Sequence, residues 1–285
     1  METKLIDGKQ IARDIRGELK EQIKAYTKQN LPTPKLVVIL VGEDPASQIY
    51  VSNKGKACGW IGMDSETVLM DADVPEEVLL GKIAQLNADP SVNGILVQMP
   101  LPEGLDEETV LMAIDPAKDV DGFHPMNVGK MAIGDPSALV SCTPAGVIQL
   151  LKRSGVEISG KRCVVAGRSN IVGKPMARLL LAENGTVTVC HSRTKDMDSI
   201  LKEADIFVSA IGKPKFFKGE QFKEGAVIID VGIHRSDDGI CGDVDFDSCL
   251  GHVSHITPVP GGVGPMTIAM LLYNTVRAYE QQHKL

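Results

Sequence analysis

The sequence predicts an α/β fold of two three-layer domains, each a parallel sheet with helices on both faces. Apolar, β-branched runs alternate with segments of helical periodicity along the chain, which is the order that parallel sheets require. The 285 residues are too many for one ordinary hydrophobic core and suit two domains. The turn-rich segment GDPSAL at 134–139 provides the boundary between them.

The first half of the chain reads as strand, helix, strand, helix, strand. The helix after the first strand has Asp44 as its N-cap and Pro45 at its first position. A second helix is expected over 75–89, where apolar residues recur at helical spacing. The expected strands are 35–41, 67–70 and 94–100, the last ending at a proline.

The second half repeats this alternation. A helix is expected over 142–155, with Thr143 as its cap, Pro144 at its start and Gly155 at its end. The last segment, 265–282, has the pattern of an amphipathic helix. The expected strands are 162–167, 186–190, 206–212 and 226–233.

Composition excludes several classes of protein. The 30 basic and 37 acidic residues give a net charge of −7, which opposes general binding to nucleic acid or to an anionic membrane. No apolar run reaches the length of a membrane span, and the N-terminus lacks the apolar core of a signal peptide. We therefore expect a cytoplasmic protein with neither nucleic acid nor membrane as a partner.

Cysteine and histidine spacing gives no sign of a metal site. The six cysteines form no CxxC pair, and the six histidines show no HExxH-like spacing. We expect reduced, mostly buried thiols and no metal.

A glycine turn joins a strand to a helix in KRCVVAGRSNIVGKPMARLLL (161–181). Dinucleotide-binding folds use GxGxxG here, whereas this chain has Gly167, Ser169 and Gly173, so one glycine is replaced and the last comes one residue late. Gly167 permits the tight turn, and a helix starting near Val172 can point free N–H groups at a pyrophosphate. The alternative is an ordinary tight turn between a strand and a helix.

The end of the next strand indicates which dinucleotide would bind. A carboxylate usually follows this strand where the ribose 2′-hydroxyl is bound, but TVTVC is followed by HSRT. Arg168, Ser192 and Arg193 supply donors and positive charge that suit a 2′-phosphate, which favours NADP over NAD. The alternative for each arginine is a solvated loop side chain.

The stretch YVSNKGKACGW (50–60) places Tyr50 and Lys54 four residues apart on an expected helix, and therefore on one face. The ordinary interpretation is an exposed helix with a solvated lysine. The other is a lysine held beside an aromatic ring for catalysis.

Eight segments together resemble the bifunctional methylenetetrahydrofolate dehydrogenase/methenyltetrahydrofolate cyclohydrolases. They occur in the family's order over residues 50–267, with one small departure at Ser141, where the family often has proline. The matching segments are YVSNKGKACGWIGM, GILVQMPLP, KDVDGFHP, CTPAGV, VVAGRSNIVGKP, HSRT, DVGI and PVPGGVGPMT.

The resemblance implies a fold, two activities and an assembly. Residues 1–140, completed by the helix 265–285, would form a folate-binding catalytic domain, and 141–264 a Rossmann-like NADP-binding domain. The two would flank a folate cleft, and the protein would be a homodimer through the Rossmann-like domain. The implied reactions are NADP-dependent oxidation of 5,10-methylenetetrahydrofolate and hydrolysis of the product to 10-formyltetrahydrofolate.

The resemblance also assigns site residues. Lys54 would be the catalytic lysine, Gln98 its hydrogen-bond partner, Tyr50 the ring that stacks on folate, and Asp121 the acid that grips the pterin. The substrate would also meet Met99, Pro100, Pro260, Gly261 and Gly262. The cofactor would meet Gly167, Arg168, Ser169, Ile171, Gly173, Ser192, Arg193 and Ile233.

Elementary chemistry agrees with these roles. A neutral glutamine can orient a lysine without raising its pKa as a carboxylate would, and one carboxylate can accept two adjacent pterin N–H groups. Spacing alone does not separate Asp121 from Asp119 and Asp115, and an Asp-Gly turn is the plainer interpretation. Two other functions remain open: a shikimate-dehydrogenase-like NADP enzyme, and a folate or nucleotide sensor without turnover.

Overall fold

The computed structural model describes residues 2–236 and 239–285. The chain forms two compact units, which we call the N-unit (Asp14–Val140 with Leu271–Leu285) and the C-unit (Met1–Arg13 with Ser141–Met270). The division falls inside helices α1 (Gly8–Lys28) and α10 (Val263–His283), so each of these helices contributes residues to both units.

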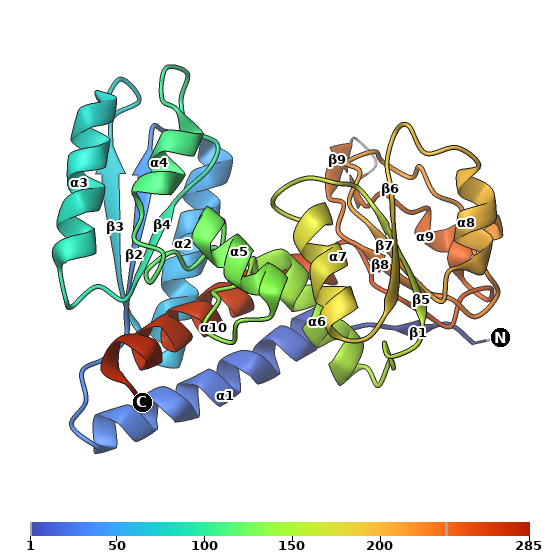
Figure 1. Ribbon diagram of the computed structural model, residues 1–285, viewed down its shortest axis with the longest axis horizontal. Coiled ribbons are helices and arrows are strands. Elements are labelled where there is room, and N and C mark those ends of the chain that lie inside the picture. Colours follow the sequence, from blue (N-terminus) through green and yellow to red (C-terminus); the bar gives the residue numbers. More distant parts are fainter. Residues whose placement is uncertain (1, 237–238) are drawn as a thin grey trace. The chain divides into compact units, whose positions relative to one another are not determined.

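The sheet of the N-unit has three parallel strands in the order β3-β2-β4 (Figure 1). Its central strand is β2 (Lys35–Val41), flanked by β3 (Asp64–Met70) and β4 (Gly94–Val97). Strand β2 has the predicted bounds, whereas β3 begins three residues earlier than predicted and β4 ends three residues earlier. The six residues from Leu36 to Val41 are all buried, as expected for a strand covered on both faces.

Helices cover both faces of this sheet. Val37, Ile39 and Val41 share one apolar cluster with residues of α3 (Glu76–Ala88) and α4 (Glu107–Ala113). Side chains alternate along a strand, so the equally buried even-numbered residues of β2 face the other side. Helix α2 (Pro45–Ile61) packs against β2 and β3, and the short helix α5 (Pro125–Ile133) follows the last strand. The N-unit therefore has the predicted three layers.

The sheet of the C-unit has six strands, all parallel, in the order β1-β11-β8-β7-β5-β6. Strand β5 pairs with β6 on one side and with β7 on the other, and β8 then pairs with β7. Such a reversal of strand order marks the ligand crevice of doubly wound folds. The strands are β1 (Lys4–Leu5), β5 (Arg162–Ala166), β6 (Thr186–Cys190), β7 (Ile206–Ser209), β8 (Val227–Asp230) and β11 (His255–Ile256).

Both faces of this sheet are also buried. Val164, Phe207 and Ile228 belong to an apolar cluster with residues of α8 (Met197–Glu203) and α9 (Phe246–Cys249). The alternate residues Val165 and Val208 are buried on the other face, where α7 (Gly173–Ala182) contacts β5 and β6 and packs on α6 (Cys142–Arg153). A hairpin of β9 (His234–Ser236) and β10 (Gly239–Cys241) and the 3₁₀ turn η1 (Gly219–Gln221) complete the unit.

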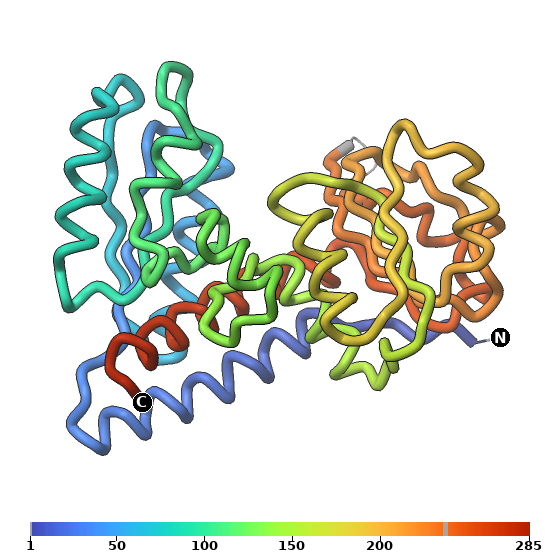
Figure 2. The backbone as a smooth tube through the Cα atoms, viewed as in Figure 1, coloured from blue at the N-terminus to red at the C-terminus, as the bar shows by residue number. Residues whose placement is uncertain are grey.

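The start of the chain differs from the sequence-based division, which placed residues 1–140 together. Lys4 and Leu5 pair with His255 and Ile256 at the edge of the C-unit sheet. Figure 2 shows this blue N-terminal segment running beside the orange strands of that unit. The pairing covers two residues only, which is too short for periodicity to reveal.

The N-cap of α6 and the state of the cysteines can also be set against the predictions from the sequence. Ser141, rather than Thr143, precedes α6, while the Thr143 hydroxyl hydrogen-bonds that of Thr267 at 3.0 Å. All six cysteines are free thiols, and five of them are buried. In the described part of the chain, no helix is long and apolar enough to span a membrane.

Candidate functional site

The predicted site residues fall into two groups, each within one unit. The N-unit holds Tyr50, Lys54, Gln98, Met99, Pro100 and Asp121. The C-unit holds the predicted cofactor residues together with Pro260, Gly261 and Gly262.

Lys54 is a buried lysine on α2. The helix starts as predicted, because the Asp44 carboxylate accepts a 2.7 Å hydrogen bond from the Ser47 N–H and Pro45 occupies the first turn. Lys54 is only 8% exposed, whereas Lys56 on the same helix is exposed. Burying an ammonium group costs free energy unless it is hydrogen-bonded. The solvated-helix interpretation therefore does not describe Lys54.

Gln98 is the hydrogen-bond partner of this lysine. Lys54 Nζ donates to Gln98 Oε1 at 2.9 Å, and Gln98 Nε2 donates to the Met99 carbonyl at 2.7 Å. The Gln98 backbone N–H donates to the Ile39 carbonyl at 2.9 Å, which continues the sheet beyond β4. The Nε2 bond fixes the plane of the amide, so Oε1 faces the lysine. The next peptide bond, Met99–Pro100, is cis.

The structure separates Asp119 from Asp121, which spacing alone could not do. The Asp119 carboxylate accepts hydrogen bonds from the backbone of Gly122 (3.2 Å) and His124 (2.8 Å) and from Asn127 Nδ2 (3.0 Å). Two of these donors belong to the loop that follows Asp119 and the third to α5, so Asp119 fixes the loop and the start of that helix. The third competitor, Asp115, likewise binds the N–H of its neighbour two residues on.

Asp121 shares an electrostatic environment with Lys54. Burial raises the pKa of the Asp121 carboxyl to about 6, an increase that the positive charge of Lys54 opposes and the negative charge of Asp119 reinforces. Asp121 is therefore close enough to the lysine for their charges to interact. A carboxylate with this pKa is mostly ionised at pH 7 and able to accept N–H groups.

The segment that carries Asp121 is held in place by residues that sequence analysis missed. Asn274 of α10 donates through Nδ2 to the Val120 carbonyl at 2.8 Å. Lys118, which is buried, donates through Nζ to three carbonyls at the end of α3, those of Leu86 (3.0 Å), Asn87 (2.9 Å) and Asp89 (2.6 Å). Lys118 is itself the first residue of the KDVDG motif, but the motif does not indicate its partners, which lie about 30 residues away.

Tyr50 lies one helical turn before Lys54, and 48% of its surface is exposed. An exposed ring beside a buried polar group suits stacking on a planar ligand. The stacking role stays a prediction.

In the C-unit, the turn after β5 requires glycine at two predicted positions. Gly167 has φ of +124°, and a Cβ added to it would lie 2.3 Å from the Ala210 carbonyl oxygen. A Cβ added to Gly173 would lie 2.3 Å from the Gly167 carbonyl oxygen. The backbone at the end of β5 thus packs closely against the start of α7 and against the residue after β7, as in a dinucleotide-binding turn.

Ser169 changes the expectation of free N–H groups at the start of α7. Its hydroxyl accepts hydrogen bonds from the N–H groups of Val172 (3.2 Å) and Gly173 (3.4 Å). The Lys174 N–H donates to the Ser169 carbonyl at 3.0 Å. A pyrophosphate bound to these N–H groups would have to displace the Ser169 hydroxyl. A serine in place of the middle glycine makes this local cap possible.

The turn after β6 presents donors to solvent. His191 and Thr194 close it, because the His191 N–H donates to Thr194 Oγ1 at 2.9 Å. Ser192 and both arginines are exposed, and among residues 2–236 and 239–285 no ion pair engages Arg168 or Arg193. Two further predicted cofactor residues, Ile171 and Ile233, are exposed apolar side chains.

The PVPGG loop packs tightly within the C-unit. A Cβ added to Gly262 would lie 2.7 Å from the Pro258 carbonyl oxygen, and Gly261 has φ of +114°. The Lys9 N–H donates to the Gly261 carbonyl at 3.1 Å, and the Val259–Pro260 peptide bond is cis. The glycines thus have a packing role here, and contact with a ligand stays a prediction.

Two hollows of the C-unit lie at opposite ends of the strands of its sheet. One, of about 430 Å³, lies where β8 and β11 end, beside the PVPGG loop, and is lined in part by Lys215, Asp230, Thr257, Pro258 and Val259. It lies at the edge where ligands of such sheets bind.

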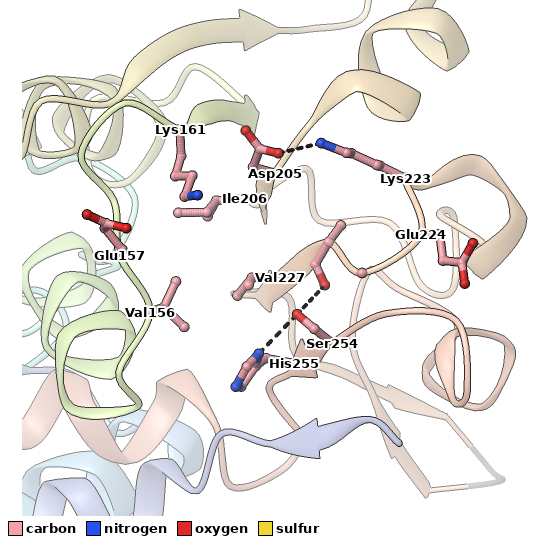
Figure 3. Close-up of a pocket in the computed structure, with 12 residues that line it drawn as sticks. Val156, Glu157, Lys161, Asp205, Ile206, Lys223, Glu224, Val227, Ser254 and His255 are labelled. Atoms are coloured by element: carbon pink, nitrogen blue, oxygen red, sulfur yellow. Dashed lines mark hydrogen bonds and ion pairs between the residues drawn. The ribbon is translucent and has the colours of Figure 1, made fainter. Parts of the chain in front are cut away.

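The other, of about 350 Å³, lies where β5, β7, β8 and β11 begin and contains no predicted site residue. Figure 3 shows that some of its polar side chains pair with one another, namely Lys223 with Asp205 at 2.6 Å and His255 with Ser254 at 3.0 Å. We assign no function to this hollow.

Comparison with known proteins gives matches along the whole chain. Residues 6–121 match the family model of the tetrahydrofolate dehydrogenase/cyclohydrolase catalytic domain, and residues 141–283 that of its NAD(P)-binding domain. The bifunctional protein FolD of Acetivibrio thermocellus is 56% identical over 286 residues, covering 100% of both chains.

Solved structures agree with these matches. The bifunctional FolD dehydrogenase/cyclohydrolase of Campylobacter jejuni has a TM-score of 0.95 at 46% identity, covering 98% of this chain and 99% of that one. The Trypanosoma brucei enzyme, complexed with NADP cofactor and an inhibitor, has a TM-score of 0.93 at 40% identity, covering 100% of both chains.

Proposed function

The chain belongs to the tetrahydrofolate dehydrogenase/cyclohydrolase family, and we propose that it carries out both reactions of that name. It oxidises 5,10-methylenetetrahydrofolate with NADP⁺ and then hydrolyses the methenyl product to 10-formyltetrahydrofolate. The shikimate-dehydrogenase-like alternative is set aside, because both domain models and full-length relatives match the bifunctional family.

One observation carries the proposal: the buried ammonium group of Lys54 is hydrogen-bonded to the neutral amide of Gln98 and close enough to Asp121 for their charges to interact. Acid–base catalysis needs a proton carrier that is positioned and shielded from bulk water. A solvated lysine on a helix has neither property.

The C-unit turn fits NADP. Its fit rests on the backbone cradle at Gly167 and Gly173, which any Cβ would fill, and on the exposed donors of Arg168, Ser192 and Arg193. We propose that these residues hold the pyrophosphate and the 2′-phosphate. When bound, NADP⁺ supplies a hydride acceptor for the one-carbon bridge of folate.

The oxidation depends mainly on positioning, because the nitrogen lone pairs of the substrate drive hydride departure. We propose that Asp121 accepts two adjacent N–H groups of the pterin and that the Tyr50 ring stacks on the folate. We propose that Met99 and Pro100 also contact the substrate. Holding the reacting groups together in a fixed orientation supplies much of the rate enhancement.

The hydrolysis depends on Lys54. Water adds to the methenyl carbon and must lose a proton, and a ring nitrogen must gain one as the ring opens. We propose that Lys54 Nζ moves these protons, with Gln98 Oε1 fixing its direction. A substrate cation beside the lysine favours the neutral amine, the form that can accept a proton.

Absorbance of methenyltetrahydrofolate tests both reactions. It should rise when methylenetetrahydrofolate and NADP⁺ are mixed with enzyme. It should fall when enzyme is added to methenyltetrahydrofolate without cofactor, faster than the uncatalysed decay. Absence of both changes in a folded protein that still binds folate would instead support the sensor hypothesis.

Two further features complete the proposal. We propose a homodimer formed through the C-unit, supported by the family resemblance, and light scattering after gel filtration should give twice the mass of the 30.6 kDa chain. We propose a cytoplasmic location, supported by six free thiols, which reducing compartments maintain. Fractionation of the source cells tests the location.

A further inference from the structure

Asp243 is a fully buried carboxylate that is not among the predicted site residues. It follows β10, and 0% of its surface is exposed. Both of its oxygens are hydrogen-bonded. Three of its five donors are backbone N–H groups of one loop, and the other two are the side chains of Ser209 and His234.

The backbone donors form the loop that follows β7. Asp243 Oδ2 accepts from the N–H groups of Ile211 (2.8 Å) and Gly212 (3.3 Å), and Oδ1 accepts from that of Lys213 (2.9 Å). Ser209 Oγ, at the end of the strand, donates to Oδ2 at 2.9 Å. The carboxylate therefore fixes the direction in which the chain leaves the sheet.

This loop adjoins the cofactor turn. The Ala210 N–H donates to the Ala166 carbonyl at 2.8 Å, and the Ala210 carbonyl oxygen is the atom that a Cβ at Gly167 would strike. Ala210 thus links the loop of residues 211–213 to the glycine turn at the carboxyl edge of the sheet, where dinucleotides bind.

The same carboxylate also holds the other flank. His234 Nε2 lies 2.8 Å from Asp243 Oδ1, and His234 directly follows Ile233, a predicted cofactor residue. A Cβ added to Gly232 would lie 2.3 Å from Asp243 Oδ1, so the chain here wraps closely around the carboxylate. One side chain thus joins the loop beside the cofactor turn to the segment that carries Ile233.

A second buried acid supports the first. Asp230, at the end of β8, accepts hydrogen bonds from the backbone of Asp243 (3.0 Å), Val244 (2.7 Å) and Gly232 (2.9 Å). It therefore fixes the backbone from which Asp243 projects. Asp230 and Asp243 therefore connect the buried end of β8 to the loops at the carboxyl ends of the strands, where ligands bind.

We propose that Asp243 is a positioning residue for NADP, which holds the loop after β7 and the Ile233–His234 segment in the conformation that receives the cofactor. This inference rests on the proposed function and adds to it a residue that touches neither folate nor the Lys54 group. Loss of the carboxylate should weaken cofactor binding and leave the cofactor-independent hydrolysis in place.

The test compares Asp243→Asn and His234→Phe with Asp73→Asn, which makes the same amide substitution at an exposed carboxylate of the N-unit. An amide places a donor against backbone donors, so the Kd of NADP⁺, measured by titration without folate, should rise about 10- to 100-fold in Asp243→Asn. His234→Phe removes one donor from a partly exposed position, and we expect a rise of about fivefold. Asp73→Asn should match wild type.

The outcomes separate the inference from the proposed function. Hydrolysis of methenyltetrahydrofolate without cofactor should stay within about twofold of wild type in His234→Phe, and the KM for folate should not change. If Asp243→Asn does not fold, His234→Phe decides alone. Unchanged NADP⁺ affinity in His234→Phe, or in a folded Asp243→Asn, overturns the inference. A wild-type protein that binds NADP⁺ yet catalyses neither reaction overturns the proposed function instead.

Discussion

Lys54 Nζ lies 2.9 Å from Gln98 Oε1, so a neutral amide is one hydrogen-bond partner of a buried ammonium group that also interacts electrostatically with Asp121. A carboxylate at this distance would stabilise the protonated form strongly and make the lysine a poor base. An amide oxygen orients Nζ through one hydrogen bond with a smaller effect of this kind. Gln98 can therefore keep the lysine aligned without adding a second negative charge to that of Asp121.

Removing the proton carrier should separate the two activities. Lys54→Met keeps an unbranched apolar stem, so the buried position remains filled. We expect the cyclohydrolase rate to fall by about 10²–10⁴, the usual contribution of a positioned acid–base group. The dehydrogenase should fall less, because hydride departure depends mainly on positioning, and the methenyl product should accumulate.

The matched control is Lys56→Met on the same helix, where the side chain is exposed. It should change both rates little, because exposed substitutions rarely disturb a site. A Lys54→Met enzyme that hydrolyses methenyltetrahydrofolate at nearly the wild-type rate would contradict the proposed mechanism.

Asp121 should control folate affinity. Asp121→Asn keeps the shape but turns one acceptor into a donor that faces pterin N–H groups, which costs about 1–3 kcal/mol when a buried donor is left unpaired. The KM and Kd for folate should rise, while the Kd for NADP⁺ should hold. Because the pKa of the wild-type carboxyl is about 6, wild-type folate affinity should also fall as the pH drops below 6. Unchanged folate binding in the variant would exclude Asp121 as the anchor.

Much of the fold could be predicted because its signals are local. The bounds of β2 and β6 agree with those predicted from the sequence, since each is a continuous run of strand-forming residues that ends at breakers or polar residues. The start of α2 agrees because a capping aspartate and a proline act within one turn. In contrast, β1 spans two residues and pairs with a strand 251 positions away, which no local pattern reveals.

The candidate site shows the same division. Lys54, Gln98 and Asp121 could be proposed from motifs and the family resemblance, but only the structure shows that the Asp119 carboxylate is engaged by its own loop and by α5. Likewise, the sequence indicated the turn at Gly167 but not that the Ser169 hydroxyl occupies N–H groups of α7. Side-chain hydrogen bonds of this kind depend on backbone direction, which the sequence pattern does not contain.

Cofactor preference should depend on the two exposed arginines. No carboxylate directly follows β6, and Arg168 and Arg193 are exposed, which is why we propose that they bind the 2′-phosphate. Wild type should have a higher kcat/KM with NADP⁺ than with NAD⁺. Arg168→Ala and Arg193→Ala should each raise the KM for NADP⁺, and the larger effect identifies the residue that contacts the phosphate. The KM for NAD⁺ should change little in both, and a wild type that prefers NAD⁺ would contradict this interpretation.

Substitution by asparagine should change the free energy of unfolding in opposite directions at Asp121 and Asp119, although the two residues lie only two positions apart. Burial raises the pKa of Asp121 from 3.8 to about 6, so the folded state binds its proton more tightly than the unfolded state. The carboxyl group therefore stabilises the fold below about pH 4 relative to neutral pH, and this contribution is lost as the pH rises from 4 to 6.

Asp121→Asn removes that penalty, which corresponds to about 3 kcal/mol at pH 7, and should increase the free energy of unfolding there. Asp119→Asn leaves backbone and side-chain donors facing an amide and should lower that free energy by about 1–3 kcal/mol. Urea unfolding at pH 4, 5, 6 and 7 measures both. The Asp121→Asn curve should fall less steeply with pH than that of wild type. A loss of stability in Asp121→Asn at pH 7 would show that this carboxylate supports the fold and is not held there for a ligand.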